Sequence, residues 1–196
     1  SGLSKYLDKN NASEVLAIGH TRWATHGRPS QENSHPHSSS RVCVVHNGII
    51  ENHKELRADL EAKGAKFISE TDSEVVPYLF EENLAKFLTD EGNIMEQVKA
   101  ALMETLKQVE GSYALVIMIR DFPQFLIVAK KGSPLLIGMA EKGNMIASDY
   151  NALSDHTNKT VYLKDDEFAF VYKDEIYLFD GDGNGLEPEV KIMDDA

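Results

Sequence analysis

The spacing of apolar residues changes along the chain, and the change predicts helices in the first half and strands in the second. In the first half, apolar residues recur three and four positions apart, as on the buried face of an amphipathic helix. After Gly111 they gather in short runs separated by turn sequences such as Lys142-Gly143-Asn144. Helices grouped early and strands grouped late predict an α+β fold with mainly antiparallel sheets covered by helices.

The expected elements follow from these patterns. A short helix is expected over residues 3–7 and a buried strand over 15–18. Longer helices are expected at 52–63, from the capping-box sequence Thr71-Asp72-Ser73-Glu74 through Phe87, and at 94–109. Strands are expected at 42–45, 114–119, 125–129, 135–137, 145–147, 160–163, 167–172, 176–179 and 189–192.

Two polar stretches interrupt this pattern. Residues 20–40 hold two prolines, several histidines and three consecutive serines, which predicts a long loop. Long loops inside compact domains are commonly functional. The strand at 42–45 is expected to end at His46-Asn47-Gly48, where the chain would turn.

Charge and cysteine content narrow the possible functions. The chain has 196 residues, with 20 Lys plus Arg against 32 Asp plus Glu, and so a net charge of −12. Such a surface repels nucleic acid and anionic membranes, whereas a small neutral or zwitterionic substrate is compatible with it. The single cysteine, Cys43, allows no internal disulfide, and no signal peptide or membrane-spanning run is seen. We therefore expect a cytoplasmic protein.

Four residues near the predicted turns could form a site for an α-amino acid, in which Arg22 and Asp72 bind its two charged groups. Arg22 offers a planar guanidinium suited to a carboxylate, and Asp72 offers an acceptor for an ammonium group. Asn47 and Gly48 could direct a side-chain amide and a backbone N–H at one point, which is how an oxyanion hole is built. Taken singly, each has a structural alternative: an Arg–Asp ion pair, a plain Asn-Gly turn and, for Trp23, ordinary packing.

Metal sites and a purely structural role are the competing interpretations. No zinc-binding spacing accompanies the clustered histidines, which favours loop histidines without a bound metal. These histidines are His20, His26, His35, His37 and His46. Residues 180–185 match the opening of an EF-hand loop, but Pro188 and Lys191 stand where ligands are needed, so a hairpin turn is expected. A chain that folds and catalyses nothing is the third alternative.

Taken together, the motifs resemble one family. The chain is similar to the glutaminase domains of the glucosamine-6-phosphate synthase family, which are class II glutamine amidotransferases. The similarity is carried by Arg22-Trp23-Ala24-Thr25-His26-Gly27, His35-Pro36-His37, His46-Asn47-Gly48-Ile49-Ile50-Glu51-Asn52 and Ser69-Glu70-Thr71-Asp72-Ser73-Glu74. Weaker matches follow at 111–114, 132–135 and 147–149. Other class II amidotransferases share the Arg, Asn-Gly and Asp positions, but their flanking residues differ.

The resemblance implies a fold and a set of partners. The fold would be the four-layer αββα sandwich of N-terminal-nucleophile hydrolases, incomplete at its N-terminus. Residues 1–196 would form a single, partial glutaminase domain that needs no cofactor. Its substrate would be L-glutamine, and the ammonia would serve to make glucosamine-6-phosphate from fructose-6-phosphate bound in separate isomerase domains. A homo-oligomer is expected.

The resemblance also implies roles for individual residues. Arg22, helped by Thr25 and His26, would hold the α-carboxylate of glutamine, and Asp72 would hold its α-amino group. Asn47 and Gly48 would stabilise the oxyanion of the tetrahedral intermediate. Trp23 would belong to a mobile lid.

The cysteine nucleophile of this family stands at the mature N-terminus, and no counterpart is found here. Ser1-Gly2 is interpreted as a truncation point, and Cys43 as a small buried side chain with a raised pKa. The isolated chain is therefore expected to be inactive. Loss of central strands is also expected to leave a gap in the sheet beside Val44 and Ile18.

Overall fold

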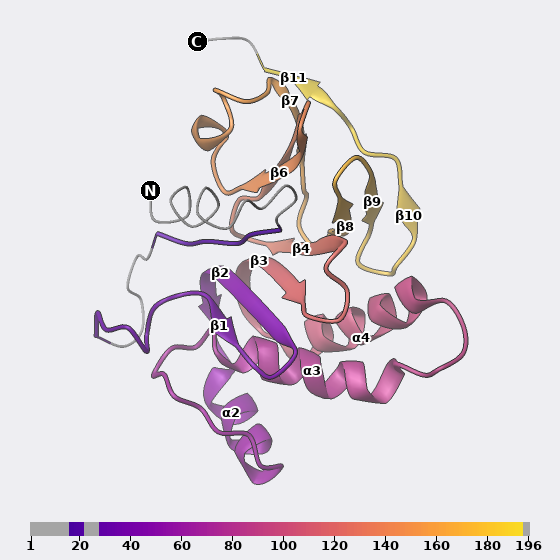
Figure 1. The fold of residues 1–196 in the computed structure, drawn as a ribbon. Helices are drawn as coiled ribbons and strands as arrows, with labels where there is room; N and C mark the ends of the chain where they lie inside the picture. The colour runs from indigo at the N-terminus through magenta and orange to yellow at the C-terminus, as the bar shows by residue number, and fades with distance from the viewer. Residues whose placement is uncertain (1–15, 22–27, 194–196) are drawn as a thin grey trace, which may run out of the picture.

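The computed structural model describes residues 16–21 and 28–193. The helix expected at 3–7 and most of the arginine motif lie outside the described residues. Three helices lie together against one face of a large sheet, and a smaller sheet is stacked on its other face (Figure 1). The helices are α2 (His53–Ala62), α3 (Val75–Phe87) and α4 (Ile94–Gln108). In the described part of the chain, no helix has the length and apolar character needed to cross a bilayer.

Both sheets are antiparallel throughout. The large sheet has the order β1-β2-β3-β4-β8-β9-β10. Its strands are β1 (His37–Ser38), β2 (Val42–Ile50), β3 (Gly111–Ile119), β4 (Phe125–Lys131), β8 (Phe168–Tyr172), β9 (Ile176–Phe179) and β10 (Gly185–Leu186). The small sheet has the order β11-β7-β5-β6, with strands β11 (Lys191–Ile192), β7 (Lys159–Tyr162), β5 (Leu136–Ala140) and β6 (Gly143–Ala147).

The larger core fills the space between the helices and the large sheet. Phe80 of α3 and Leu102 of α4 are fully buried there against Leu115 of β3 and Ile127 of β4. Alternate residues of each strand point to this face because successive side chains in a strand point to opposite sides. The helical spacing seen in the sequence thus marks the residues that cover the sheet.

A second core lies between the two sheets. Val128 and Ala169 of the large sheet pack there with Ile137 and Val161 of the small sheet. Beyond the small sheet, the 3-10 helix η1 (Tyr150–Ala152) is followed by buried Leu153. Leu153 lies so close to Gly138 that a Cβ on this glycine would be 2.9 Å from Leu153 Cδ1. The described layers therefore run helix, sheet, sheet, and the predicted α+β class is confirmed.

Most predicted elements are confirmed, but one predicted strand and the predicted gap in the sheet are not. The three long helices are present, and strands are found at every predicted position after Gly111. Residues 16–18 form no strand because, in the described part of the chain, no neighbouring strand pairs with them. The gap expected beside Val44 is also absent, since Val44 pairs with Ile117 of β3 and with His37 of β1.

The predicted capping box is wrong. Glu74 is the N-cap residue of α3, and no side chain caps this helix. The Glu74 carboxylate instead accepts hydrogen bonds from the backbone N–H groups of Ile68 (2.9 Å) and Ser69 (2.7 Å). It therefore folds the segment before the helix back on itself.

Candidate functional site

The structure describes three of the predicted site residues: Asn47, Gly48 and Asp72. Arg22, Trp23, Thr25 and His26 lie outside the described residues. The described part of the candidate site therefore consists of β2 and the segment that leads into α3.

Asp72 lies against the strand that carries Asn47. Its side chain is buried, with 2% of the residue exposed, and its Oδ2 accepts a hydrogen bond from the backbone N–H of Ile50 at 2.7 Å. Ile50 is three residues beyond Asn47 on β2, which corresponds to about 10 Å along a strand. Asp72 thus contacts the same strand that carries Asn47 and Gly48.

His46 joins the same two segments. It is 3% exposed, with its Nδ1 2.8 Å from Ser73 Oγ and its Nε2 3.4 Å from the carbonyl oxygen of Ser112. Because a carbonyl can only accept, Nε2 carries the proton and Nδ1 accepts from the Ser73 hydroxyl. Burial lowers the pKa of His46, and the opposing effect of nearby Asp72 is smaller. His46 is therefore a neutral link between β2 and the Asp72 segment.

Asn47 is held by a histidine from the polar loop. Its Oδ1 lies 2.6 Å from His20 Nε2, while His20 Nδ1 is buried and has no hydrogen-bond partner among the described residues. With Nε2–H of His20 donating, the carbonyl side of the Asn47 amide is occupied and its Nδ2 is the group left to donate. That orientation suits an oxyanion-hole donor.

The prediction that Asn47 and Gly48 end a strand is wrong. β2 continues to Ile50, and these two residues lie opposite Ala114 and Tyr113 of β3. An Asn-Gly sequence favours a turn, and so it predicts a strand end. Pairing with β3 instead keeps both residues in an extended strand.

Gly48 occupies a position that only glycine tolerates. Its φ is +129°, and a Cβ there would lie 2.2 Å from the carbonyl oxygen of Ser112 and 3.1 Å from Ser133 Oγ. Real Cβ atoms do not come this close to a backbone oxygen. The backbone at Gly48 therefore approaches β3 more closely than any other residue would allow.

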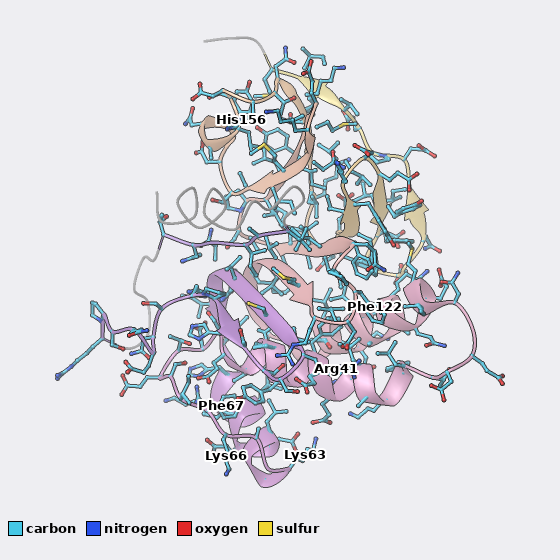
Figure 2. The ribbon with its side chains drawn as sticks, in the orientation of Figure 1. Arg41, Lys63, Lys66, Phe67, Phe122 and His156 are labelled. Atoms are coloured by element: carbon cyan, nitrogen blue, oxygen red, sulfur yellow. The ribbon has the colours of Figure 1, made fainter. Side chains whose placement is uncertain are left out.

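The segment that carries Asp72 is firmly tied to α2. Arg57 donates to the carbonyl oxygen of Thr71 at 3.0 Å, and its guanidinium lies 4.3 Å from the ring centre of Phe67. Phe67 is labelled beside α2 in Figure 2. Together with the Glu74 carboxylate, these contacts hold the segment in one conformation. The local sequence pattern gives no role to Arg57, places His20 and His46 only among the clustered histidines, and interprets Glu74 as a capping-box residue. The contacts of His20, His46 and Arg57 join residues at least 14 positions apart, which no local pattern signals.

The structure gives no support to the metal alternatives. The ring centres of His20 and His35 lie 4.2 Å apart with the rings tilted by 31°, and in the described part of the chain no three His, Cys, Asp or Glu side chains are arranged to hold a metal ion. Asp180 accepts hydrogen bonds from the backbone N–H groups of Asp182 (3.0 Å) and Asn184 (2.9 Å), within the turn that joins β9 to β10. The predicted hairpin turn is confirmed.

Cys43 differs from its expected environment. It is half-buried rather than buried, and it lies on β2 opposite Met118. Asn47 is four positions further along β2, so the two are about 13 Å apart along the strand.

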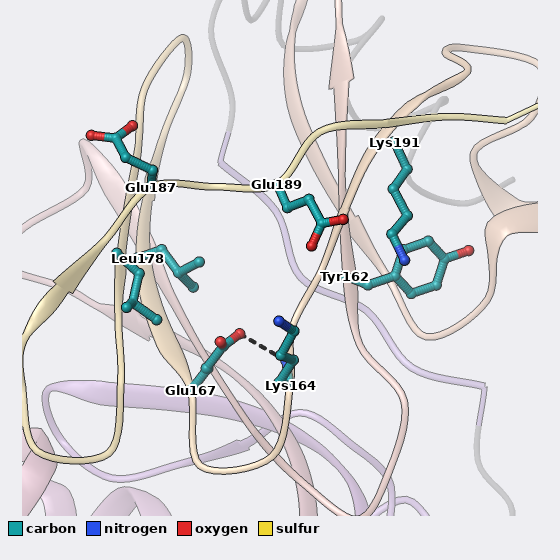
Figure 3. A pocket seen from close by; sticks show the side chains of 8 residues that line it. Tyr162, Lys164, Glu167, Leu178, Glu187, Glu189 and Lys191 are labelled. Atoms are coloured by element: carbon teal, nitrogen blue, oxygen red, sulfur yellow. Dashed lines mark hydrogen bonds between the residues drawn. The ribbon is translucent and has the colours of Figure 1, made fainter.

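A pocket of about 260 Å³ lies elsewhere, between the small sheet and the β9–β10 hairpin (Figure 3). It contains none of the predicted site residues. Its lining combines both signs of charge with apolar side chains: Tyr162, Lys164, Glu167, Leu178, Leu186, Glu187, Glu189 and Lys191. Glu167 accepts from the backbone N–H of Lys164 at 2.7 Å, so one of the pocket's acids already stabilises its own turn.

Comparison with known sequences identifies relatives across almost the whole chain. Residues 20–155 match the family described as glutamine amidotransferase domain. The chain is 44% identical to a glutamine–fructose-6-phosphate aminotransferase (isomerizing) of Clostridium perfringens over 192 residues, 97% of this chain and 30% of that protein. It is also 44% identical to the protein of that name from Methanocaldococcus jannaschii over 190 residues, 93% of this chain and 17% of that protein. The chain thus spans less than a third of the length of these relatives.

A solved structure shares the fold. A glutamine phosphoribosylpyrophosphate amidotransferase from B. subtilis, complexed with ADP and GMP, superposes with a TM-score of 0.63 at 24% identity. The match covers 85% of this chain and 35% of the other. The expected fold class is confirmed by this likeness.

Proposed function

Because the chain belongs to the family of glutamine amidotransferase domains, we propose that it is the glutamine-hydrolysing part of a glutamine–fructose-6-phosphate aminotransferase. The enzyme would take the amide nitrogen of L-glutamine and deliver it to fructose-6-phosphate, which would bind in further domains of the protein. The identity of 40–44% to aminotransferases of this name supports this choice. The net charge of −12 also favours a small zwitterion over nucleic acid as the partner.

One observation carries the proposal: the buried carboxylate of Asp72 is hydrogen-bonded to Ile50 of β2, the strand that also carries the Asn47-Gly48 pair. Glutamine carries an α-ammonium group at one end and a reactive amide at the other. Asp72 would bind the ammonium group, and Arg22 with Thr25 and His26 would bind the α-carboxylate. Trp23 would close over the bound substrate.

The oxyanion is the second requirement of amide hydrolysis. Attack of a thiolate on the side-chain amide carbon places negative charge on the amide oxygen; ammonia then leaves, and water cleaves the thioester. The Nδ2 group of Asn47 and the backbone N–H of Gly48 would stabilise that charge. The thiolate is not assigned to Cys43, which lies about 13 Å from Asn47 along β2.

The test is a glutaminase assay on the full-length protein. Release of glutamate from L-glutamine, stimulated by fructose-6-phosphate and accompanied by glucosamine-6-phosphate, is the expected result. Stimulation by phosphoribosylpyrophosphate instead would assign the chain to the phosphoribosylpyrophosphate amidotransferases, which share its fold. Absence of glutamate release under both conditions would overturn the proposal.

A further inference from the structure

Asn33 makes a contact that none of the proposed roles uses. It is 4% exposed and lies between the arginine motif and β1. Its Nδ2 donates to the carbonyl oxygen of Arg28 at 3.0 Å and to Glu70 Oε2 at 3.4 Å, while its Oδ1 accepts from the backbone N–H of Glu70 at 2.8 Å. A single buried amide thus joins two segments that are 37 residues apart in the chain.

The orientation of this amide is fixed by its partners. The carbonyl of Arg28 can only accept a hydrogen bond, and the N–H of Glu70 can only donate one. A rotation of the amide by 180° would oppose like groups at both ends, so Asn33 has one arrangement. An aspartate would keep the acceptor for Glu70 and lose the donor to Arg28.

The two joined segments are those proposed to hold the two charged groups of glutamine. Arg28 follows directly after residues 22–27, which include Arg22. Glu70 lies two residues before Asp72. A second contact, 3.0 Å between Thr71 Oγ1 and His37 Nε2, ties the Asp72 segment to β1 but does not reach Arg28.

We propose that Asn33 is a positioning residue for glutamine, which sets the place of Arg28 relative to the Asp72 segment. The inference rests on the proposed function. The α-carboxylate and α-ammonium groups of an amino acid are attached to one carbon atom, so the residues that bind them must be held at a fixed separation. A displacement of about 1 Å, caused by a substitution far from the reacting atoms, can lower the rate by about 100-fold.

Two substitutions test the link in the full-length enzyme. Asn33→Ala removes all three hydrogen bonds, and Asn33→Asp removes only the donors. We expect both to lower kcat/KM for glutamine by about 10- to 100-fold, mainly through KM. Because the carboxylate introduced by Asn33→Asp would also repel that of Glu70, this substitution is combined with Glu70→Gln, which relieves the repulsion and still leaves Arg28 without its donor. Activity within about twofold of wild type in this double variant would overturn the role of the Arg28 link.

Asn83→Ala is the matched control. Asn83 is another buried amide, fully covered, and it donates to Thr105 Oγ1 at 2.9 Å between α3 and α4. Its loss should lower the unfolding temperature and leave KM for glutamine unchanged. Equal changes of KM in the Asn33→Ala and Asn83→Ala variants would show that general destabilisation is the cause, and would overturn the proposal.

Hydrogen–deuterium exchange separates this inference from the proposed function. In peptides covering residues 68–72, Asn33→Ala should increase the exchange rate about tenfold, whereas Asn83→Ala should not. Unchanged protection would overturn the inference whatever the activity. A wild-type enzyme without glutaminase activity would overturn the proposed function, and the exchange measurement would still decide whether Asn33 holds the two segments together.

Discussion

At the scale of single residues, the candidate site depends on His46 as much as on the residues that would touch glutamine. His46 precedes Asn47 in β2 and accepts a hydrogen bond from Ser73, the neighbour of Asp72. The motifs predict Asn47 and Asp72 because their chemistry is visible in the sequence. The contact that relates them joins residues 27 positions apart, and no local pattern signals such a contact.

Asn47→Ala in the full-length enzyme should lower kcat for glutamine hydrolysis by about 10²–10³, with little change in KM. An oxyanion donor acts on charge that develops only in the transition state. Steady-state kinetics of glutamate release measure both constants. A raised KM at unchanged kcat would instead make Asn47 a residue that binds the substrate before reaction.

His46 should make the stability of the protein depend on pH. Its pKa is lowered in the folded state by burial, while in the unfolded chain it stays near 6.5. Below that pH the unfolded state binds one more proton, so the stabilisation is complete above about pH 6.5 and is lost as pH falls through the folded-state pKa. The slope reaches at most about 1.4 kcal/mol per pH unit.

Urea unfolding between about pH 7 and pH 5 measures this slope. His46→Gln, which can still accept from Ser73 and donate to Ser112, should flatten it. His156→Gln is the control, because His156 is exposed (Figure 2). Equal slopes in wild type and His46→Gln would contradict the assignment.

At the scale of elements, the sequence predicts the helices better than it predicts β2, the strand that carries Asn47 and Gly48. The helices at 53–62, 75–87 and 94–108 follow local apolar spacing, so their positions are available from the sequence. The polar residues of β2 are typical of a turn, so local pattern ends this strand too early, at His46. Pairing with β3 overrides that local preference, and it sets the position of Asn47 in the sheet.

Gly48→Ala should destabilise the protein by about 2–4 kcal/mol, since it combines an unfavourable φ with a clash against the Ser112 carbonyl oxygen. Thermal or urea unfolding measures the change. Gly185→Ala is the matched control, because Gly185 is also a strand glycine and a Cβ there would meet nothing within 4 Å. A loss no larger than that of the control would show that β2 shifts to accept the methyl group.

At the scale of the whole molecule, the sequence predicts the class of fold but not the order of its strands. Grouped helices followed by short strands are sufficient for an antiparallel α+β fold. The placement of β4 beside β8, and the division of the strands between two sheets, depend on which apolar faces meet across the second core. That choice is made by contacts between distant residues, which spacing along the chain does not encode.

The 196-residue chain by itself should release no glutamate from L-glutamine. Amide attack needs an activated nucleophile within reach of the oxyanion donors, and Cys43 and Ser73 are candidates in the described part of the chain. Cys43 lies about 13 Å from Asn47 along β2. Ser73 is hydrogen-bonded to His46 as a nucleophile is to its base, but both are 3% exposed, and the other nitrogen of His46 faces a carbonyl rather than a carboxylate.

A sensitive glutaminase assay on the purified chain, with Cys43→Ser and Ser73→Ala as parallel variants, tests the prediction that the chain alone releases no glutamate. Calorimetric titration with L-glutamine on the same samples separates lost chemistry from lost binding. Turnover that disappears in only one of the variants would contradict the prediction and identify the nucleophile. Turnover that survives in both would instead point to a nucleophile outside this pair. Binding without turnover would show that this chain holds glutamine and depends on a nucleophile supplied from outside its described residues.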